Sequence, residues 1–548
     1  MQQLTGLDAA FLALDTPTST GHVGGVHVLQ GHPGGGRPPL TLERLTQIIA
    51  DRLHLVPSLR RRIVEVPFGL DQPYWVEDPA FDLEFHVREL ALPAPGTTRQ
   101  LTEQVARIHA RPLDRSRPLW ETYLIHGLEH DRVVLYMKVH HSMIDGVAGQ
   151  ELATALLDPS PEGREVPPAP PWRAESLPTG GELLARTLGS YAVQPWRAVK
   201  LTADVVRAAP GLLSTVVAPR LPLVDRLVAH PGVLSHTPVR APATPFNKPV
   251  SPHRRVALRT LSFEVVRAVK SASGMTVNDV VLAICAGALR RWLIRHDALP
   301  EGPLVAALPV SVRASGGAVK GGDGTLGNRV SLMIAVLPTN LEDPLDRLVA
   351  VHASTQRAKE EHQALPADVI SELYALTMPN LVGLAARANA QLRLLERAAP
   401  FNLFVSNVPG PPIPLFVSGA EVIASYPVSA ITDGQGLNIT VVSYLGGLHF
   451  GLISDRELVP DLEDLAAFLE DELETLARGT GRSDAAELAA RLAREPVPLE
   501  PLLDAPAASA RVTAPRRTAV AGGAAPAPAP ATRSAGARRR SGPSSPDA

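Results

Sequence analysis

The chain has 548 residues, of which 45% are hydrophobic and 20% are charged, and its formal net charge at pH 7 is −2. This length exceeds what one simple core holds, so we expect two sizeable domains, and the small net charge gives no indication of a nucleic-acid partner. The single Cys285 excludes an internal disulfide and a cysteine-based metal cluster, and it fits a reducing cytosol.

The first part of the chain predicts an α/β unit over residues 1–160. Apolar residues at helical spacing predict helices over 41–56 and 99–110, and the apolar run 131–140 predicts a buried strand. A further helix is expected over 146–157. Strands and helices that alternate in this way indicate the α/β class.

Residues 161–250 are assigned to a linker region. The stretch 159–178 is rich in proline and in small or acidic residues, which is typical of a linker. The stretch 183–233 is apolar and basic and predicts amphipathic helices. These either pack between the two domains or contact a lipid surface.

A second α/β unit is expected over residues 251–480. Its predicted helices are 261–271, 277–295, 345–363, 384–397 and 461–478, and its predicted strands are 304–312, 329–337, 401–407, 437–444 and 448–454. Residues 481–548 form a helical end and a tail rich in Ala, Pro and Arg, which buries too little apolar surface to fold. We expect the tail to be disordered, and it either binds anionic lipid or nucleic acid or only adds solubility.

The chain shows no feature of a secreted or membrane-spanning protein. No Lys or Arg precedes Arg37, so the charged start of a secretory signal is missing. No clean apolar span reaches the roughly 20 residues that a transmembrane helix needs. We expect a cytoplasmic protein that does not cross a membrane but can lie on one.

The strongest chemical signal is Val-His-His-Ser-Met-Ile-Asp-Gly at residues 139–146, where the predicted strand meets a turn. A metal site is disfavoured, because adjacent side chains on a strand point to opposite faces and no third ligand is evident. Structural histidines are a second interpretation. The third has His141 as a general base near neutral pH, with Asp145 holding the loop and Gly146 permitting the tight turn.

Other catalytic templates fit poorly. A Gly-x-Ser-x-Gly elbow and a phosphate-binding Gly-x-x-x-x-Gly-Lys-Ser/Thr loop are both missing. Residues 322–327 match Gly-x-Gly-x-x-Gly, but a predicted strand follows them where a dinucleotide site needs a helix. We therefore discard that match.

The pattern His-His-x-x-x-Asp-Gly resembles the motif of the acyl-CoA-dependent acyltransferase superfamily, which includes chloramphenicol acetyltransferase and the condensation domains of peptide synthetases. Other segments are similar to the bacterial wax ester synthase/diacylglycerol acyltransferases. These are 7–11, 112–121 with its Pro-Leu-Trp, 278–283 with its Asn-Asp, 309–313, 326–328 and 406–411. The resemblance runs over residues 4–475, and the number and order of the motifs make it specific.

This resemblance implies two chloramphenicol-acetyltransferase-like domains that form a pseudo-dimer with a central tunnel. Long-chain acyl-CoA would enter from one side, and diacylglycerol or a fatty alcohol from the other. No cofactor is implied besides acyl-CoA as co-substrate, and no metal. The apolar acceptor implies that the protein visits the inner membrane face or a lipid droplet as a peripheral protein.

The resemblance also implies roles for residues of the motif. His141 activates the acceptor hydroxyl, which attacks the thioester directly, so no acyl-enzyme forms. His140 supports it, and Asp145 is structural and is expected to form an ion pair with Arg313. Gly146 lets the next helix start close to the substrate site.

Two further residues keep two interpretations each. Asn278 either donates a hydrogen bond to the developing oxyanion or caps the predicted helix 277–295. Asp279 is expected in the first turn of that helix, favoured by the helix dipole. Trp120 either packs in the core or lines the acyl channel.

The leading functional hypothesis is an O-acyltransferase that makes triacylglycerol or wax ester. One alternative is a related transferase with another acceptor, such as an amine, or with a carrier-bound acyl donor. A second alternative is a weakly active protein that coats lipid droplets. The intact His-His-x-x-x-Asp-Gly and Asn-Asp motifs argue against the coat protein.

Overall fold

The computed structural model describes residues 1–31, 38–143, 156–172, 174–190, 241–311, 330–364 and 399–481. The chain divides into two units, Met1–Val497 and Pro498–Ala548, and the second lies wholly outside the described residues. The predicted helix 384–397, residues 146–155 of another predicted helix, the segment 191–233 and the basic tail also lie outside them.

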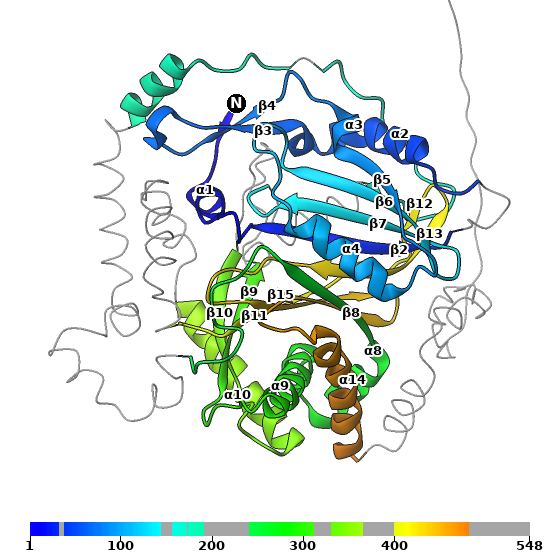
Figure 1. Ribbon diagram of the computed structural model, residues 1–548, viewed down its shortest axis with the longest axis vertical. Coiled ribbons are helices and arrows are strands. Elements are labelled where there is room, and N and C mark those ends of the chain that lie inside the picture. Colours follow the sequence, from blue (N-terminus) through cyan, green and yellow to red (C-terminus); the bar gives the residue numbers. More distant parts are fainter. Residues whose placement is uncertain are drawn as a thin grey trace, which may run out of the picture. The chain divides into compact units, whose positions relative to one another are not determined.

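The described part of the first unit contains two six-stranded sheets, one three-stranded sheet and the helices that cover them (Figure 1). The predicted α/β class is therefore confirmed. A tunnel between the two halves stays a prediction.

The first sheet carries the predicted strand 131–140 at its centre. Its strands, in spatial order, are β12 (Phe416–Val417), β13 (Ala420–Val428), β2 (His22–Leu29), β7 (Arg132–His140), β6 (Trp120–Leu128) and β5 (Val87–Ala91). β7 pairs antiparallel with β2 on one side and β6 on the other. Nearly all of its side chains are buried, which explains its almost continuous apolar sequence.

Two strands of this sheet come from the far end of the chain. β12 and β13 belong to residues 416–428, yet β13 pairs along β2. The predicted boundaries of 1–160 and 251–480 do not anticipate this exchange, and they stay a prediction. The two halves are interlocked rather than merely linked.

The second sheet is built from the C-terminal half. Its strands, in spatial order, are β10 (Val330–Leu337), β9 (Leu304–Ser311), β11 (Leu403–Val408), β14 (Leu437–Tyr444), β15 (Gly447–Asp455) and β8 (Arg254–Ser262). The five predicted strands of this half are confirmed with small shifts at their ends. The β14–β15 hairpin turns through Leu445 and Gly446, which both have positive φ.

One predicted helix of this half begins too early. The apolar spacing predicts a helix from Leu261, but Leu261 and Ser262 are the last residues of β8. The Ser262 hydroxyl accepts a hydrogen bond from the N–H of Val265 at 3.3 Å and caps the following helix. The helix therefore starts at Phe263.

A small third sheet contains β1 (Gln2–Gln3), β4 (Tyr74–Glu77) and β3 (Arg61–Val64), in that order. Short 3-10 turns flank it at η1 (Leu53–Leu55), η2 (Pro57–Arg60) and η3 (Pro67–Gly69). It lies beside the first sheet in the upper part of Figure 1.

The structure confirms five of the predicted helices and adds two short ones, Gly6–Ala13 and Leu83–His86, that were not predicted. The N-terminal half has α1 (Gly6–Ala13), α2 (Leu42–Arg52), α3 (Leu83–His86) and α4 (Thr98–Ala110), and the C-terminal half has α8 (Phe263–Ser273), α9 (Val277–Arg295), α10 (Pro344–Ala364) and α14 (Leu462–Gly479). The predicted helices 41–56, 99–110, 277–295, 345–363 and 461–478 are confirmed, although the first ends as a 3-10 turn.

Helix α9 is the core helix of the second half. It packs against α10 and α14, and most of its residues are buried, including small ones that allow close approach. A Cβ on Gly287 would lie 1.9 Å from the Glu472 carboxylate of α14. Glu472 in turn binds Arg347 and Arg291 at 2.6 Å each.

The two large sheets contact each other through polar and backbone groups. β13 contacts β15, and α4 lies against β8. The Tyr426 hydroxyl lies 2.8 Å from the hydroxyl of Thr260, and a Cβ on Gly451 would lie 1.6 Å from the carbonyl oxygen of Pro427. The absence of a side chain at Gly451 therefore lets the two backbones meet.

Within the described residues, no single helix has both the length and the apolar character to cross a membrane. The pair α8 and α9 passes that test together, on length and composition only, and is bent by 105° between the two helices.

Candidate active site

The double histidine stands where the central strand β7 ends. β7 ends at His140, and the next residue, His141, begins a turn closed by a hydrogen bond of 2.9 Å from the Met143 N–H to the His140 carbonyl. The His141 N–H donates to the carbonyl of Gly21 at 2.7 Å, and the His140 N–H donates to that of Leu119 at 3.0 Å. The segments around Gly21 and Leu119 therefore fix the main chain of the two histidines.

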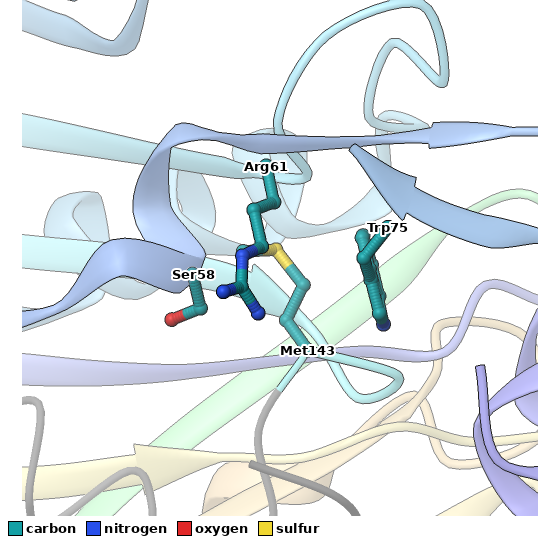
Figure 2. Close-up of a pocket in the computed structure, with 4 residues that line it drawn as sticks. All are labelled: Ser58, Arg61, Trp75 and Met143. Atoms are coloured by element: carbon teal, nitrogen blue, oxygen red, sulfur yellow. The ribbon is translucent and has the colours of Figure 1, made fainter. Parts of the chain in front are cut away.

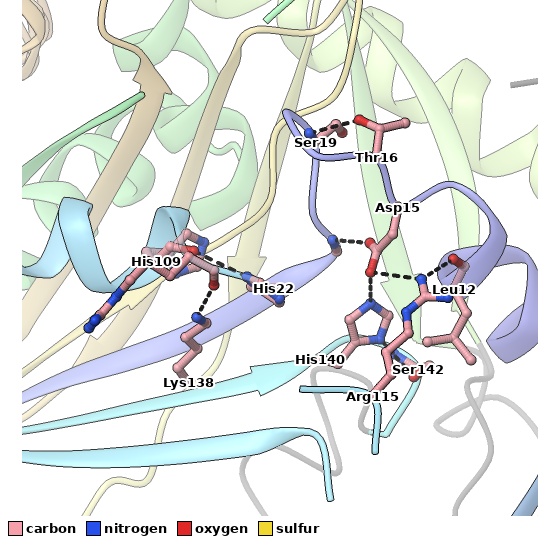
Figure 3. Close-up of polar contacts among 12 residues, drawn as sticks. Leu12, Asp15, Thr16, Ser19, His22, His109, Arg115, Lys138, His140 and Ser142 are labelled. Carbon is pink, nitrogen blue, oxygen red and sulfur yellow. Dashed lines mark hydrogen bonds and ion pairs between the residues drawn. The ribbon is translucent and has the colours of Figure 1, made fainter. Parts of the chain in front are cut away.

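The two imidazoles have different neighbours. His140 is 1% exposed and contacts Asp15 and Ser142 (Figure 3). His141 is half-buried, and its ring stacks on Phe11 with ring centroids 4.3 Å apart and an angle of 18° between the planes. In the part of the chain that the structure describes, no group of three or more His, Cys, Asp or Glu side chains gathers as a metal site would need.

Asp15 is the polar partner of His140. One carboxylate oxygen accepts from the Gly21 N–H at 2.7 Å, and the other lies 3.1 Å from His140 Nε2 and 3.2 Å from a guanidinium nitrogen of Arg115. Burial tends to raise the pKa of Asp15, but the contacts with His140, Gly21 and Arg115 outweigh it, so its pKa is lowered. Asp15 is therefore an anion near neutral pH.

The far side of His140 is bound by the turn. The Ser142 N–H donates to His140 Nδ1 at 3.1 Å, and the Ser142 hydroxyl lies 2.7 Å from the same nitrogen. A backbone N–H can only donate, so Nδ1 acts as an acceptor and the ring proton is assigned to Nε2, which faces Asp15. These contacts assign one tautomer to His140.

A second layer of buried polar groups lies behind His140. The ring of His22 meets that of His140 edge to face at 5.9 Å, and His22 Nδ1 lies 3.1 Å from the carbonyl of His109. Burial lowers the pKa of His109 to about 3 and that of His22 well below its ordinary value, so both are neutral near pH 7. Lys138, with no exposed surface, donates to the carbonyl of Ile108 at 3.0 Å, and burial lowers its pKa to about 8.

A small pocket opens beside the turn. It is lined by Ser58, Arg61, Trp75 and Met143, which come from η2, the small sheet and the turn after His141 (Figure 2). None of the predicted site residues is among these four lining residues.

Two independent family models match this chain. The model of the wax ester synthase/diacylglycerol acyltransferase catalytic domain matches residues 4–281, and that of the WS/DGAT C-terminal domain matches residues 326–477. The chain belongs to the wax ester synthase/diacylglycerol acyltransferase family. As a member of this family it is an acyltransferase, so the sequence resemblance and the predicted enzyme class are confirmed.

Relatives of the family match over most of their length. The chain is 36% identical over 480 residues to a probable diacylglycerol O-acyltransferase of Mycobacterium tuberculosis, which covers 86% of this chain and 98% of that protein. It is 32% identical over 474 residues to the O-acyltransferase WSD of Acinetobacter baylyi, covering 86% of this chain and 96% of that protein.

Two solved structures match most of this chain. The wax ester synthase/diacylglycerol acyltransferase from Marinobacter aquaeolei matches with a TM-score of 0.62 at 30% identity, covering 88% of this chain and 100% of that one. The first condensation domain of the calcium-dependent antibiotic synthetase matches with a TM-score of 0.51 at 17% identity, covering 88% and 96%. The second match shows a shared fold alone.

The Asn-Asp motif of this family member opens helix α9. The interpretation of Asn278 as the helix cap is wrong, because the Thr276 hydroxyl caps α9 by accepting from the N–H of Asp279 at 3.2 Å. Asn278 lies in the first turn, and its amide oxygen accepts from Asn407 Nδ2 at 3.4 Å. This contact joins the Asn-Asp motif to the segment 406–411, two motifs that are far apart in the sequence.

Asp279 is in the first turn of α9, as predicted, and has no exposed surface. Its carboxylate accepts from the N–H of Thr276 at 3.0 Å, from the Thr355 hydroxyl at 2.6 Å and lies 2.8 Å from His352 Nδ1. Burial tends to raise the pKa of Asp279, but these hydrogen bonds outweigh it and lower the pKa. Asp279 therefore holds α9 and α10 together.

Trp120 is a core residue of the family's Pro-Leu-Trp motif. It is 1% exposed, its indole N–H donates to the carbonyl of Leu59 at 2.8 Å, and its ring stacks on His86 at 4.5 Å. These contacts favour the packing interpretation. The role in the acyl channel stays a prediction.

Asp145, Gly146 and Arg313 lie outside the described residues, so the pairing of Asp145 with Arg313 stays a prediction. The sequence interpretation missed Asp15 and the role of Arg115 beside it. Arg115 lies inside the segment 112–121 that carried the resemblance, and Asp15 follows the opening segment 7–11 closely. Their places in or next to these motifs could have pointed to both residues, but an Asp or an Arg in the sequence does not show which side chain it contacts.

Proposed function

We propose that this acyltransferase transfers a long-chain acyl group from acyl-CoA to the hydroxyl of diacylglycerol or a fatty alcohol, with His141 as the general base. The observation that carries the proposal is the position of His141. It stands at the end of the central strand, half-buried, with its main chain bound to Gly21 and its ring stacked on Phe11. A rigid strand end is a suitable site for a group that must take up a proton at a fixed point.

The reaction needs one base and one oxyanion donor. His141 takes the proton of the acceptor hydroxyl while the oxygen attacks the thioester carbonyl, and a tetrahedral oxyanion forms. The oxyanion collapses, the C–S bond breaks, and the leaving CoA sulfur receives the proton from His141. The acyl group passes directly to the acceptor, so the reaction needs no acyl-enzyme, no metal and no cofactor besides acyl-CoA as co-substrate.

Asn278 is the proposed oxyanion donor. Its amide oxygen faces Asn407, so its NH₂ group points away from that contact, as a donor to the substrate requires. A well-placed donor of this kind contributes about 3–4 kcal/mol to stabilising the transition state. Because Asn278 belongs to the C-terminal half and His141 to the N-terminal half, one catalytic site would need residues of both halves.

The remaining predicted residues have supporting roles in this proposal. Asp145 and Arg313 form the ion pair that shapes the catalytic loop, Gly146 allows the next helix to start close to it, and Trp120 supports the site by packing in the core beneath it. Exchange of the two charges between Asp145 and Arg313 should restore part of the activity that either single variant loses. Complete lack of restoration would contradict the ion pair.

The replacement His141→Ala tests the proposal. The purified protein is given labelled palmitoyl-CoA with a panel of acceptors: diacylglycerols, fatty alcohols and an amine. A parallel reaction replaces palmitoyl-CoA by an acyl carrier protein that carries the acyl group, and products are separated by class. We expect wild type to form labelled ester from palmitoyl-CoA and His141→Ala to lose that activity by at least about 100-fold while its thermal unfolding stays cooperative. Full activity of the variant, or acyl transfer only from the carrier protein, would contradict the proposal.

The apolar acceptor also requires contact with a lipid surface. We assign this contact to the segment 183–233, which is apolar and basic, and to the arginine-rich tail. A chain truncated after residue 500 should bind anionic liposomes less well than the full chain in a co-sedimentation assay. Undiminished binding would remove the tail from this role.

A further inference from the structure

Asp15 meets the reactive turn indirectly, through the ring of His140. The imidazole spans from the carboxylate of Asp15, 3.1 Å from Nε2, to the backbone N–H of Ser142, 3.1 Å from Nδ1. Ser142 is the residue that directly follows His141. A rigid chain of three groups therefore connects the N-terminal segment to the backbone beside the proposed base.

Residues 11–21, from the last turns of α1 to the start of β2, contact the pair of histidines in three separate ways. Asp15 binds the ring of His140, the Gly21 carbonyl accepts from the His141 N–H, and Phe11 stacks on the His141 ring. Figure 3 shows the first of these contacts, with the carboxylate of Asp15 directed at His140. One short segment thus fixes both the main chain and the ring of His141.

The position of Asp15 is itself fixed. Its second oxygen accepts from the Gly21 N–H at 2.7 Å, and Arg115 bridges the carboxylate at 3.2 Å and the carbonyl of Leu12 at 2.6 Å. A Cβ on Gly21 would lie 3.1 Å from His140 Nε2, so the lack of a side chain there allows the carboxylate and the imidazole to meet. This arrangement leaves little freedom to any of its members.

We infer that Asp15 is a positioning residue for catalysis, which acts through His140 by holding the ring proton on Nε2 and thereby fixing the turn that carries His141. The inference rests on the proposed role of His141 as the base. The charge of Asp15 selects the tautomer, because a carboxylate accepts and Nε2 must then donate. Nδ1 is left to accept from Ser142, which fixes the turn.

The variant Asp15→Asn separates this role from simple packing, because it keeps the shape of the side chain. Asp15 accepts on both oxygens, whereas an amide has one oxygen and one NH₂ group. Either orientation of the new amide directs its NH₂ group at a donor, at Gly21 or at His140. The turn then loses its fixed geometry, and a shift of about 1 Å in a reacting group costs about 100-fold in rate.

The experiment measures kcat and KM for palmitoyl-CoA in the full chain. We expect Asp15→Asn to lower kcat about 100-fold, with KM changed less than about 3-fold and the unfolding transition still cooperative. Asp15→Glu, which restores the carboxylate, should recover at least about 10-fold of that loss. If Asp15→Asn does not fold, Asp15→Glu and Asp15→Gln form a second pair of equal length, and the Glu variant should be the more active.

A spectroscopic readout reports on the tautomer directly. The ring nitrogen shifts of His140 in ¹⁵N-histidine-labelled protein, assigned by difference from His140→Gln, should show protonated Nε2 in wild type and lose that pattern in Asp15→Asn. Asp78→Asn is the matched control, since Asp78 is also buried, at 3% exposure, and accepts the N–H of Ala80 at 3.0 Å. That control should keep both kcat and the His140 shifts.

The outcomes distinguish this inference from the proposed function. If His141→Ala abolishes activity while Asp15→Asn keeps kcat within about 3-fold of wild type, the role of Asp15 is overturned and the proposed function stands. If His141→Ala retains full activity, the proposed function fails first. Equal activity of the Glu and Asn or Gln variants at Asp15 would also overturn the role of the carboxylate.

Discussion

The two halves of the molecule each contain an aspartate–histidine pair, and the two pairs are built in opposite ways. In the first half the His140 side chain is 2% exposed and that of Asp15 is 15% exposed, at a distance of 3.1 Å. In the second half the Asp279 side chain has no exposure and that of His352 is 34% exposed, at 2.8 Å. The buried member is the histidine in one pair and the carboxylate in the other.

This inversion separates positioning from structural support. His140 is bound on both ring nitrogens, so its tautomer and orientation are fixed and it transmits the position of Asp15 to the turn. Asp279 accepts from the N-cap residue of α9 and from two side chains of α10, so it joins the two helices and completes the capping box that Thr276 begins. The same two residue types therefore have different roles. Where the histidine is at the centre of the hydrogen bonds it positions the turn, and where the aspartate is at the centre it holds two helices together.

The largest effect on stability is expected for Asp279→Ala. It removes the shared acceptor of Thr276, Thr355 and His352, so three hydrogen bonds are lost together and the free energy of unfolding should fall by about 3 kcal/mol. Denaturant unfolding measures this loss. The kcat of Asp279→Ala per folded molecule should fall less than that of Asp15→Asn. The opposite order would contradict the distinction between the two pairs.

The second prediction concerns pH, because folded His109, in the layer behind His140, has a much lower pKa than the same residue in the unfolded chain. Burial lowers the pKa of folded His109 to about 3 from the ordinary value of 6.5. Between these values the unfolded state binds one proton more, so this residue makes stability rise with pH by about 1.4 kcal/mol per pH unit. His109→Gln should remove that part of the slope.

Denaturant unfolding at several values between pH 4 and pH 6.5 measures the slope in wild type and variant. Thr97→Ala is the control, because it weakens the start of the same helix, α4, without removing a titrating group. An unchanged slope in His109→Gln would show that His109 does not carry this pH dependence.

The long helices and the buried strands β7, β9, β10, β11, β14 and β15 were predictable here because their residues repeat a local pattern or form an apolar run. Helix α9 was predicted from Val277 to Arg295 and is found with those bounds, since its apolar run is long and a threonine caps it. β13 was missed although its side chains begin in the alternately buried pattern of a strand with one covered face. Its partner β2 lies about 400 residues away, and no local pattern indicates such pairing.

The candidate site was predictable as far as the motif and no further. The sequence indicated His141 and His140 from their type and spacing. The prediction against a shared metal assumed that both lie on a strand, whereas His141 begins the turn after β7. It did not indicate Asp15, because a contact across 125 residues depends on how the N-terminal segment folds back. One of the two interpretations of Asn278 made it the cap of α9, a position that Thr276 holds, since both residue types favour it.

The smallest effects come from the two capping threonines, and they sharpen the comparison most. Thr276 and Thr97 each form a capping box, on α9 and α4 respectively, so replacement of either by Ala should cost about 1 kcal/mol of stability. Of these two helices, α9 has the proposed oxyanion donor, Asn278, in its first turn, and α4 has no proposed catalytic residue there. Thr276→Ala should therefore lower kcat while Thr97→Ala does not, and equal kcat values for the two variants at matched stability would argue against Asn278 as a donor.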